Sequence, residues 1–259
     1  MTPSVPPSHP RYRSLVTRGR LVAAAKEGLV AWEGLVAHGR GEAFDYLLGE
    51  RTVPEAAVAA HAATAYLLHA DLPVLSVNGN VAVLAAEEVG ELARATRARV
   101  EVNVFHRTEA RVDALVAHLE NQGLSSVLGR DPDASIPGLD HPRALCSREG
   151  IYASDVVLVP LEDGDRAEAL VGMGKTVLSI DLNPLSRTSR AATVAIVDEV
   201  VRALRVMVAF AKEAKEHPET VEAVRRGYVK EANVRGVLGA IRAHLEAQAE
   251  PGKKAGDNV

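Results

Sequence analysis

The sequence predicts an α/β fold, with a parallel sheet covered by helices on both faces and further helices added at both ends of the chain. Short apolar runs rich in β-branched residues recur along the sequence, each bounded by polar or turn-forming residues, which is typical of buried strands. Segments with helical periodicity separate these runs, so the strands are expected to run parallel. The 259 residues, 47% of them hydrophobic, are enough for one large domain, and we expect a single domain over residues 1–259.

Five strands are expected. The clearest two are residues 176–180 and 193–197, which are rich in Val, Ile and Thr and flank a polar loop at residues 181–190. The other three are apolar or alternating runs that end at turn-forming residues. In chain order the expected strands cover residues 74–78, 99–105, 155–159, 176–180 and 193–197.

Helices are expected between and around these strands. Thr52 and Glu55 have the spacing of a capping box, and Pro54 suits the first turn of a helix. Asp198 is the expected N-cap of a later helix, because it directly precedes the first helical position. The expected helices cover residues 12–27, 34–48, 54–69, 81–97, 109–121, 167–171, 199–216, 220–226 and 230–248.

Three stretches interrupt this regular pattern. Glycines flank Arg40 on both sides, and each weakens a helix by roughly 1 kcal/mol. We therefore expect a backbone break that presents Arg40 or His38, or alternatively a plain loop between two helices. Residues 78–80 (NGN) are expected to form a tight turn. Residues 124–150 contain scattered Pro, Gly and Asp and predict a long excursion, which in a compact domain is often functional.

Composition limits the possible partners and location. A net charge of -4 provides no general attraction to nucleic acid, so any phosphate must be recognised by individually placed cations. The single cysteine, Cys146, cannot form an internal disulfide, and the sequence contains neither a signal-peptide pattern nor about 18 consecutive apolar residues. We expect a cytoplasmic protein that binds neither nucleic acid nor membrane, with an extended arm at residues 1–10 and a frayed tail at residues 250–259.

Three familiar motifs fail on inspection. Gly174-Lys175-Thr176 resembles the end of a P-loop, but Ala169 occupies the place of its first glycine and a strand follows where a helix is required. The glycines around Arg40 lack the third glycine of a dinucleotide fingerprint and follow no apolar strand, which argues against NAD or FAD. The nine histidines show no zinc-binding spacing.

Polar residues follow each of the five expected strands. In an open parallel sheet, ligands bind outside the carboxyl ends of the strands, so these residues should meet along one rim. Arg107, Arg166 and Arg187 suit phosphates and carboxylates, whereas a rim that merely faces water more often carries Lys and Glu. An ordinary polar surface is the alternative interpretation, because every strand that leaves a sheet reaches solvent. The rim residues are Asn78 and Asn80, His106 and Arg107, residues 162–166, residues 181–188, and Asp198.

Several longer runs resemble a known family, the archaeal 4-phosphopantoate-β-alanine ligases, also called phosphopantothenate synthetases. The resemblance extends in order over about residues 11–215. It implies a Rossmann-like homodimer that uses ATP to join 4-phosphopantoate to β-alanine, giving 4'-phosphopantothenate, AMP and diphosphate on the route to coenzyme A. The runs are GLVAHGRGEAFDYLLGE (34–50), VLSVNGN (74–80), EVNVFHRTEAR (101–111), ASDVVLVPLEDGDRAEAL (153–170) and MGKTVLSIDLNPLSRTS (173–189).

The resemblance also implies an ATP site. Its last two positions fall on Glu199 and Val200, and the family commonly has asparagine in place of Glu199. Arg20 is an alternative to Arg18. We hypothesise that Arg40 and Arg187 are catalytic because they neutralise the triphosphate, together with Mg²⁺. The implied ATP-binding residues are Arg18, Arg40, Asp181, Leu182, Asn183, Arg187, Thr188, Glu199 and Val200.

The residues themselves suggest where the other ligands bind. Asp181 and Asn183 can accept hydrogen bonds from the ribose or the base. Three acids, Glu162, Asp163 and Asp165, suit Mg²⁺ or the β-alanine ammonium, or else form a solvated first turn of a helix. A nucleotide- or phosphosugar-binding regulatory protein without ligase activity is the alternative function. A dehydrogenase or a helical scaffold fits less well. The candidates for 4-phosphopantoate are His38, Asn78, Asn80 and Arg107.

Overall fold

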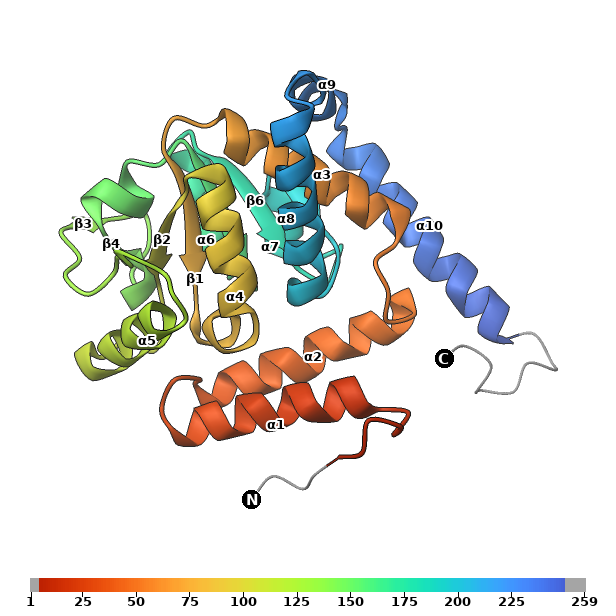
Figure 1. The fold of residues 1–259 in the computed structure, drawn as a ribbon, viewed down its shortest axis with the longest axis horizontal. Helices are drawn as coiled ribbons and strands as arrows, with labels where there is room; N and C mark the ends of the chain where they lie inside the picture. The colour runs from red at the N-terminus through yellow and green to blue at the C-terminus, as the bar shows by residue number, and fades with distance from the viewer. Residues whose placement is uncertain (1–4, 250–259) are drawn as a thin grey trace.

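A computed structural model of the chain, which describes residues 5–249, has a five-stranded parallel sheet at its centre (Figure 1). All five expected strands are confirmed, although the second ends at Val102, three residues earlier than expected. The strands lie in the order β2-β1-β5-β6-β7. Their bounds are β1 (Pro73–Val77), β2 (Arg99–Val102), β5 (Val156–Pro160), β6 (Thr176–Ile180) and β7 (Val194–Ile196).

Helices cover both faces of the sheet, as expected. In Figure 1, α4 and α8 lie in front of the sheet, whereas α6 and α7 lie behind it. The long helix α10 runs beside α3 at the edge of the fold. The helices are α1 (Tyr12–Lys26), α2 (Trp32–Leu48), α3 (Pro54–His69), α4 (Gly79–Thr96), α5 (Glu109–Asn121), α6 (Gly164–Gly172), α7 (Arg187–Ala191), α8 (Val200–Glu216), α9 (Glu219–Gly227) and α10 (Lys230–Ala249).

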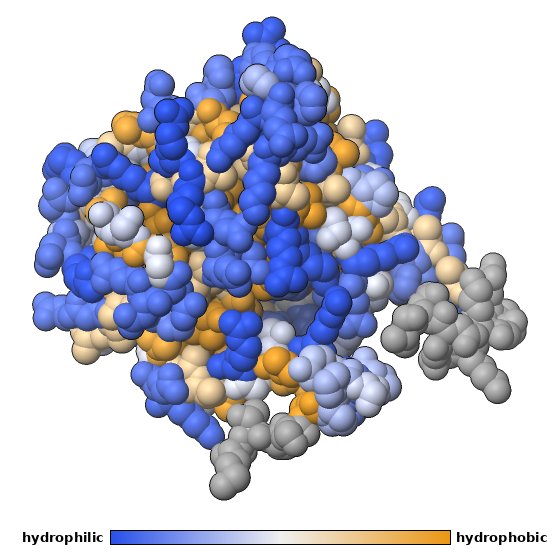
Figure 2. All heavy atoms as spheres, viewed as in Figure 1, coloured by the Kyte–Doolittle hydropathy of each residue, from blue (hydrophilic) through white to orange (hydrophobic). Residues whose placement is uncertain are grey.

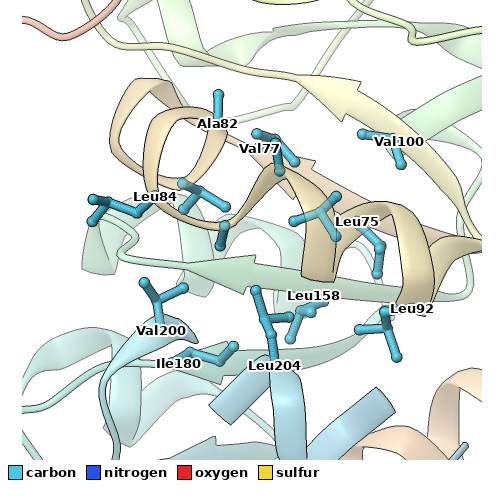
Figure 3. Close-up of a cluster of buried hydrophobic side chains, with 14 of the residues drawn as sticks. Leu75, Val77, Ala82, Leu84, Leu92, Val100, Leu158, Ile180, Val200 and Leu204 are labelled. Atoms are coloured by element: carbon cyan, nitrogen blue, oxygen red, sulfur yellow. The ribbon is translucent and has the colours of Figure 1, made fainter. Parts of the chain in front are cut away.

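Alternation along the strands divides the apolar core between the two faces. On β1, Leu75 joins the cluster beneath α4 and α8, while its neighbour Val74 joins the cluster on the opposite face. Figure 3 shows the larger cluster, in which Leu158 and Ile180 from the strands meet Leu204 of α8. Because both faces are buried, the strand residues are apolar in nearly every position, as parallel sheets require.

The strand order reverses between β1 and β5. From β1 the chain moves to the edge strand β2, and it returns to the other side of β1 through the long excursion before continuing to β6 and β7. The excursion is confirmed, and it contains a small hairpin of β3 (Ala134–Ser135) and β4 (Leu145–Cys146), a 3₁₀ turn η1 (Pro142–Ala144) and a short π-helix η2 (Arg148–Tyr152). Ligands of open α/β sheets bind at such a reversal.

The N-terminal pair α1 and α2 lies across the carboxyl ends of the strands (Figure 1). Asn80 Nδ2, in the first turn of α4, donates to the carbonyl of Gly34 in α2 at 2.9 Å. Further along α2, Asp45 accepts a hydrogen bond of 3.0 Å from Arg202 Nη1, and Arg202 Nε donates to Asp198 Oδ1 at 2.9 Å. Helix α2 is therefore fixed over the edge of the sheet at both ends.

The predicted break around Arg40 is wrong. Helix α2 continues through Gly39, Arg40 and Gly41, and a loop is excluded as well. Neither glycine is required by a close approach, because a Cβ added at Gly39 would meet nothing within 4 Å and one at Gly41 would make an ordinary contact of 3.5 Å with Leu182 Cδ1. The helix is stabilised by its contacts with the body of the protein, which outweigh the low helix propensity of glycine.

Two capping predictions are also wrong. The N-cap of α3 is Val53, and Thr52 Oγ1 instead donates to Asp198 Oδ2 at 2.5 Å. Since Asp198 is engaged by Thr52 and Arg202, the N-cap of α8 is Glu199, whose carboxylate accepts from the backbone N–H groups of Val201 and Arg202. In each case the side chain that a local pattern predicted as a cap binds a residue from another element instead.

Two turns are shorter than expected. The structure begins α4 at Gly79, so residues 78–80 form a helix start with Asn78 as N-cap rather than a separate turn. The expected loop at residues 181–190 ends early, because α7 begins at Arg187. Residues 5–10 of the expected arm include a turn at Pro6–His9, whereas the expected tail lies outside the described residues. None of the helices within residues 5–249 is long and apolar enough to cross a membrane.

Because α2 is continuous, Gly39→Ala should raise the free energy of unfolding by about 0.5–1 kcal/mol, the usual helix preference for alanine. An added Cβ at Gly39 meets nothing within 4 Å. Gly34→Ala is the matched control, since its Cβ would lie 2.5 Å from Asn80 Oδ1 and displace that side chain, which offsets the gain. Denaturant unfolding of both variants measures the difference. No stabilisation by Gly39→Ala would contradict a continuous helix.

Candidate active site

Asn78 lies at the point where the strand order reverses. Its Oδ1 accepts from the Val81 N–H at 3.1 Å and caps α4, while its Nδ2 donates to the carbonyls of Pro160 and Leu161, each at 3.1 Å. Asn78 therefore joins the carboxyl ends of β1 and β5. Leu161 has a φ of 53°, a left-handed conformation that costs a residue with a side chain about 1 kcal/mol or more. This backbone is held in place by its surroundings.

Glu162, the next residue, is the centre of a buried ion network. Its side chain is 1% exposed and is bound by two arginines, Arg166 from α6 and Arg143 from the excursion. Arg143 Nη1 lies 2.8 Å from Glu162 Oε1, and Arg143 Nε donates to Asn103 Oδ1 at 3.2 Å. Arg166 is fully buried and its Nη2 donates to Ser76 Oγ at 3.3 Å. The network ties the excursion to the carboxyl ends of three strands.

The same turn contacts α7, the short helix after the β6 loop. Thr188 Oγ1 donates to the Glu162 carbonyl at 2.7 Å. A Cβ added at Gly164 would lie 2.3 Å from Arg187 Cβ, so the backbone of α6 packs directly on α7 and only glycine fits there. Asn78, Glu162 and Thr188 are consequently parts of one connected edge, which brings residues from three separate regions of the sequence together.

The loop after β6 presents a partly buried carboxylate. Asp181 Oδ1 accepts from the Asn183 N–H at 2.9 Å, and Asn183 Oδ1 accepts from the Leu185 N–H at 2.9 Å. Burial raises the pKa of Asp181, although hydrogen bonds and the positive charge of Arg40 act in the opposite direction. Arg40 thus lies close enough to lower the pKa of Asp181, and this interaction connects α2 with the loop. Leu182 packs below them, among Leu48 and other residues of a small apolar cluster.

The space between α2 and the body of the protein is hollow. Figure 2 shows a depression between α2 and the N-terminal end of α8. Glu199 and Val200 are at this end of α8, and burial raises the pKa of the Glu199 carboxyl. Arg40 acts on Asp181 in the loop after β6, and Glu199 and Val200 form the end of α8 that borders the depression.

Three of the predicted site arginines make protein contacts that direct them elsewhere. Arg187 pairs with Glu168 at 2.7 Å on an exposed surface, so it adjoins the edge but reaches away from Asp181. Arg107 Nη2 donates to the carbonyls of Gly129 and Arg130 at 2.7 and 3.0 Å. Arg18 Nε donates to Glu42 Oε2 at 3.0 Å within the α1–α2 pair. The alternative to Arg18, Arg20, donates to the Val83 carbonyl.

The acids considered for a metal ion are engaged by other side chains of the protein. Arg143 binds Glu162 and Asp163, and His141 Nε2 lies 3.0 Å from Asp165 Oδ2. Within the part of the chain that the structure describes, three or more His, Cys, Asp or Glu side chains do not come together in a group suited to a metal ion. These acids do not fit a preformed Mg²⁺ site, and we assign no residue to the metal.

Comparison with known proteins identifies the family. Residues 55–244 match the family model described as phosphopantothenate/pantothenate synthetase. The chain belongs to this family. A 4-phosphopantoate–β-alanine ligase of Methanospirillum hungatei is 56% identical over 209 residues, which cover 81% of this chain and 85% of the relative. Proteins of the same name from Methanosarcina mazei and Thermococcus onnurineus are 51% and 49% identical and cover 95% and 96% of this chain, and 97% and 96% of their own lengths.

Family membership confirms the resemblance found in the sequence, but two features of this synthetase fold were not predicted. Arg143 lies in the irregular excursion and gave no local sign of its contact with Glu162. Arg166 was expected on the rim, yet it is buried and pairs with Glu162. The spacing of four residues between Glu162 and Arg166 was the available signal for this pair, although Glu162 precedes α6 by two residues.

The raised pKa of Asp181 has a consequence for stability. A carboxyl whose folded-state pKa exceeds its unfolded value costs stability above that folded pKa, and this cost disappears as the pH falls below about 4. Asp181→Asn should therefore unfold at higher denaturant concentration than the wild type at pH 7, with a smaller difference at pH 4. The exposed Asp131→Asn variant is the control and should show no such difference. If the difference in unfolding midpoint between Asp181→Asn and the wild type were the same at both pH values, the raised pKa of Asp181 would be contradicted.

Proposed function

We propose that this protein catalyses the ATP-dependent ligation of 4-phosphopantoate to β-alanine, with release of AMP and diphosphate. The observation that carries this proposal is the identity of 49–56% to proteins named as this ligase, over most of their length. The connected edge around Asn78, Glu162 and Thr188 supports it, because such an edge can hold two ligands side by side.

ATP would lie between α2 and the loop after β6. Arg40 beside Asp181 supports this position, since a guanidinium suits phosphate oxygens and Asp181 and Asn183 suit ribose or base. Arg187 and Thr188 follow this loop in the first turn of α7, and Arg187 would have to exchange Glu168 for phosphate. Mg²⁺ would be expected to accompany the triphosphate, whose own oxygens favour it.

The organic acid would lie beside the nucleotide, near Asn78 and Asn80 at the start of α4. Transfer of AMP to the carboxylate of 4-phosphopantoate would give an acyl-adenylate, which the amine of β-alanine then attacks. Two anions must approach each other in the first step, so fixed cations and exclusion of water lower its barrier. Holding both substrates in one orientation supplies a further part of the rate enhancement.

We also propose a homodimer. The side chains of Trp32 and Val36 are 61% and 73% exposed and lie four residues apart on the face of α2 opposite Gly34. Exposed apolar side chains that adjoin one another support a subunit contact. A sedimentation mass equal to that of one chain would overturn this proposal.

The experiment that tests the activity is incubation of the protein with ATP, 4-phosphopantoate and β-alanine, followed by measurement of AMP and phosphopantothenate. Equal amounts of both products are expected. Arg40→Ala should raise the KM for ATP about 10- to 100-fold, which corresponds to roughly 1.5–3 kcal/mol for a charge-assisted bond. Arg226→Ala, which removes an exposed partner of Glu222, is the control. Formation of ADP in place of AMP, or absence of the amide, would contradict the proposal.

A further inference from the structure

His38 lies on the face of α2 that is directed at the edge of the sheet. It follows Gly34 by four residues and precedes Gly41 by three, so all three share one side of the helix. A Cβ on Gly34 would lie 2.5 Å from Asn80 Oδ1, and a Cβ on Gly41 would lie 3.5 Å from Leu182 Cδ1. His38 is thus positioned between the start of α4 and the loop after β6, where the two substrates are proposed to meet.

The imidazole of His38 has an unused nitrogen. Its Nε2 is buried, and within residues 5–249 it has no hydrogen-bond partner. Buried polar atoms in native proteins are almost always paired, so this unpaired nitrogen can still accept a further partner such as a ligand. His141 differs in this respect, because its unpaired Nδ1 belongs to a ring whose Nε2 is held by Asp165.

The surroundings keep His38 uncharged. Burial is the largest influence and lowers the pKa of His38, Glu42 on α2 raises it, and Arg18 on α1 lowers it further. Glu42 is itself bound by Arg18 and Ser14, which reduces its effect on the ring. Asn80 and Leu182, which lie against Gly34 and Gly41 on the same side of α2, carry no charge. At neutral pH the ring is therefore a base with a free electron pair.

The proposed reaction requires such a base. The amino group of β-alanine is an aliphatic ammonium, with a pKa near that of Lys, about 10, and is therefore protonated at neutral pH. Only the free amine can attack a carbonyl carbon. We propose that His38 Nε2 takes the proton from the β-alanine ammonium as the nitrogen attacks activated 4-phosphopantoate. This inference rests on the proposed function.

The proton and electron balance is as follows. The first proton passes from nitrogen to His38, the nitrogen lone pair forms the new C–N bond, and the carbonyl electron pair moves to oxygen. His38 returns its proton to water and accepts the second proton, which the adduct nitrogen still carries. The carbonyl re-forms as the C–O bond to the phosphate of AMP breaks, and AMP leaves with that electron pair. One amide, one AMP and two protons result.

The test uses His38→Gln, which keeps a polar side chain but removes the base. With β-alanine at pH 7 its kcat should fall about 10²- to 10⁴-fold, the usual contribution of a general base, and should rise as the pH is increased toward the pKa of the amine. Hydroxylamine, which is already uncharged at neutral pH, should form the hydroxamate at near wild-type rate. Retained hydroxamate formation also shows that the variant is folded, and His38→Asn provides a second variant.

His61→Gln is the matched control. His61 is also partly buried, burial lowers its pKa too, and it stacks on Phe210 away from α2, so neither amine reaction should change. Full activity of His38→Gln with β-alanine at pH 7 would overturn the inference. Equal loss with both amines, together with a higher KM for 4-phosphopantoate, would place His38 in binding and also overturn it. Absence of both products in the wild type would instead refute the proposed ligase activity.

Discussion

The structure depends on the ion triad that fixes α2 across the carboxyl ends of the strands. Arg202 joins Asp45 of α2 to Asp198 after β7, and Thr52 donates to the same aspartate. An open parallel sheet normally leaves its ligand-binding edge exposed to water. Here α2 covers that edge and brings Arg40 and His38, two residues of the proposed site, from a region far from the sheet in sequence. Electrostatic interactions with a nucleotide are stronger in a partly desolvated space.

A second buried network connects the two halves of the candidate site. Glu162 is bound by Arg143 and Arg166, while its backbone carbonyl holds Thr188 and the preceding residue holds Asn78. Buried charges seldom increase net stability, because desolvation offsets their attraction, yet loss of one partner typically costs about 3–5 kcal/mol. The arrangement is better explained by fixed geometry. It would keep the proposed nucleotide and acid positions at a constant separation.

The sequence predicted most of the fold because its signals are local. β-Branched runs marked all five strands, and helical periodicity predicted residues 109–121, which are the bounds of α5. Prediction failed where a distant partner decided the outcome. Thr52 has capping spacing but binds Asp198, 146 positions away, and the glycines around Arg40 remain helical because α2 is held on the body of the protein by distant partners such as Asn80 and Arg202. Arg143 in the excursion offered no pattern at all, since its role depends on the turn after β5.

The central claim is that the nucleotide binds between α2 and the loop after β6. Hydrogen–deuterium exchange of the full chain, with and without ATP, measures this directly. ATP should slow amide exchange in α2 and at residues 181–188 together, while exchange in α9, which lies far from α2 in Figure 1, should not change. Slower exchange in the loop with no change in α2, or protection confined to another part of the chain, would contradict the account.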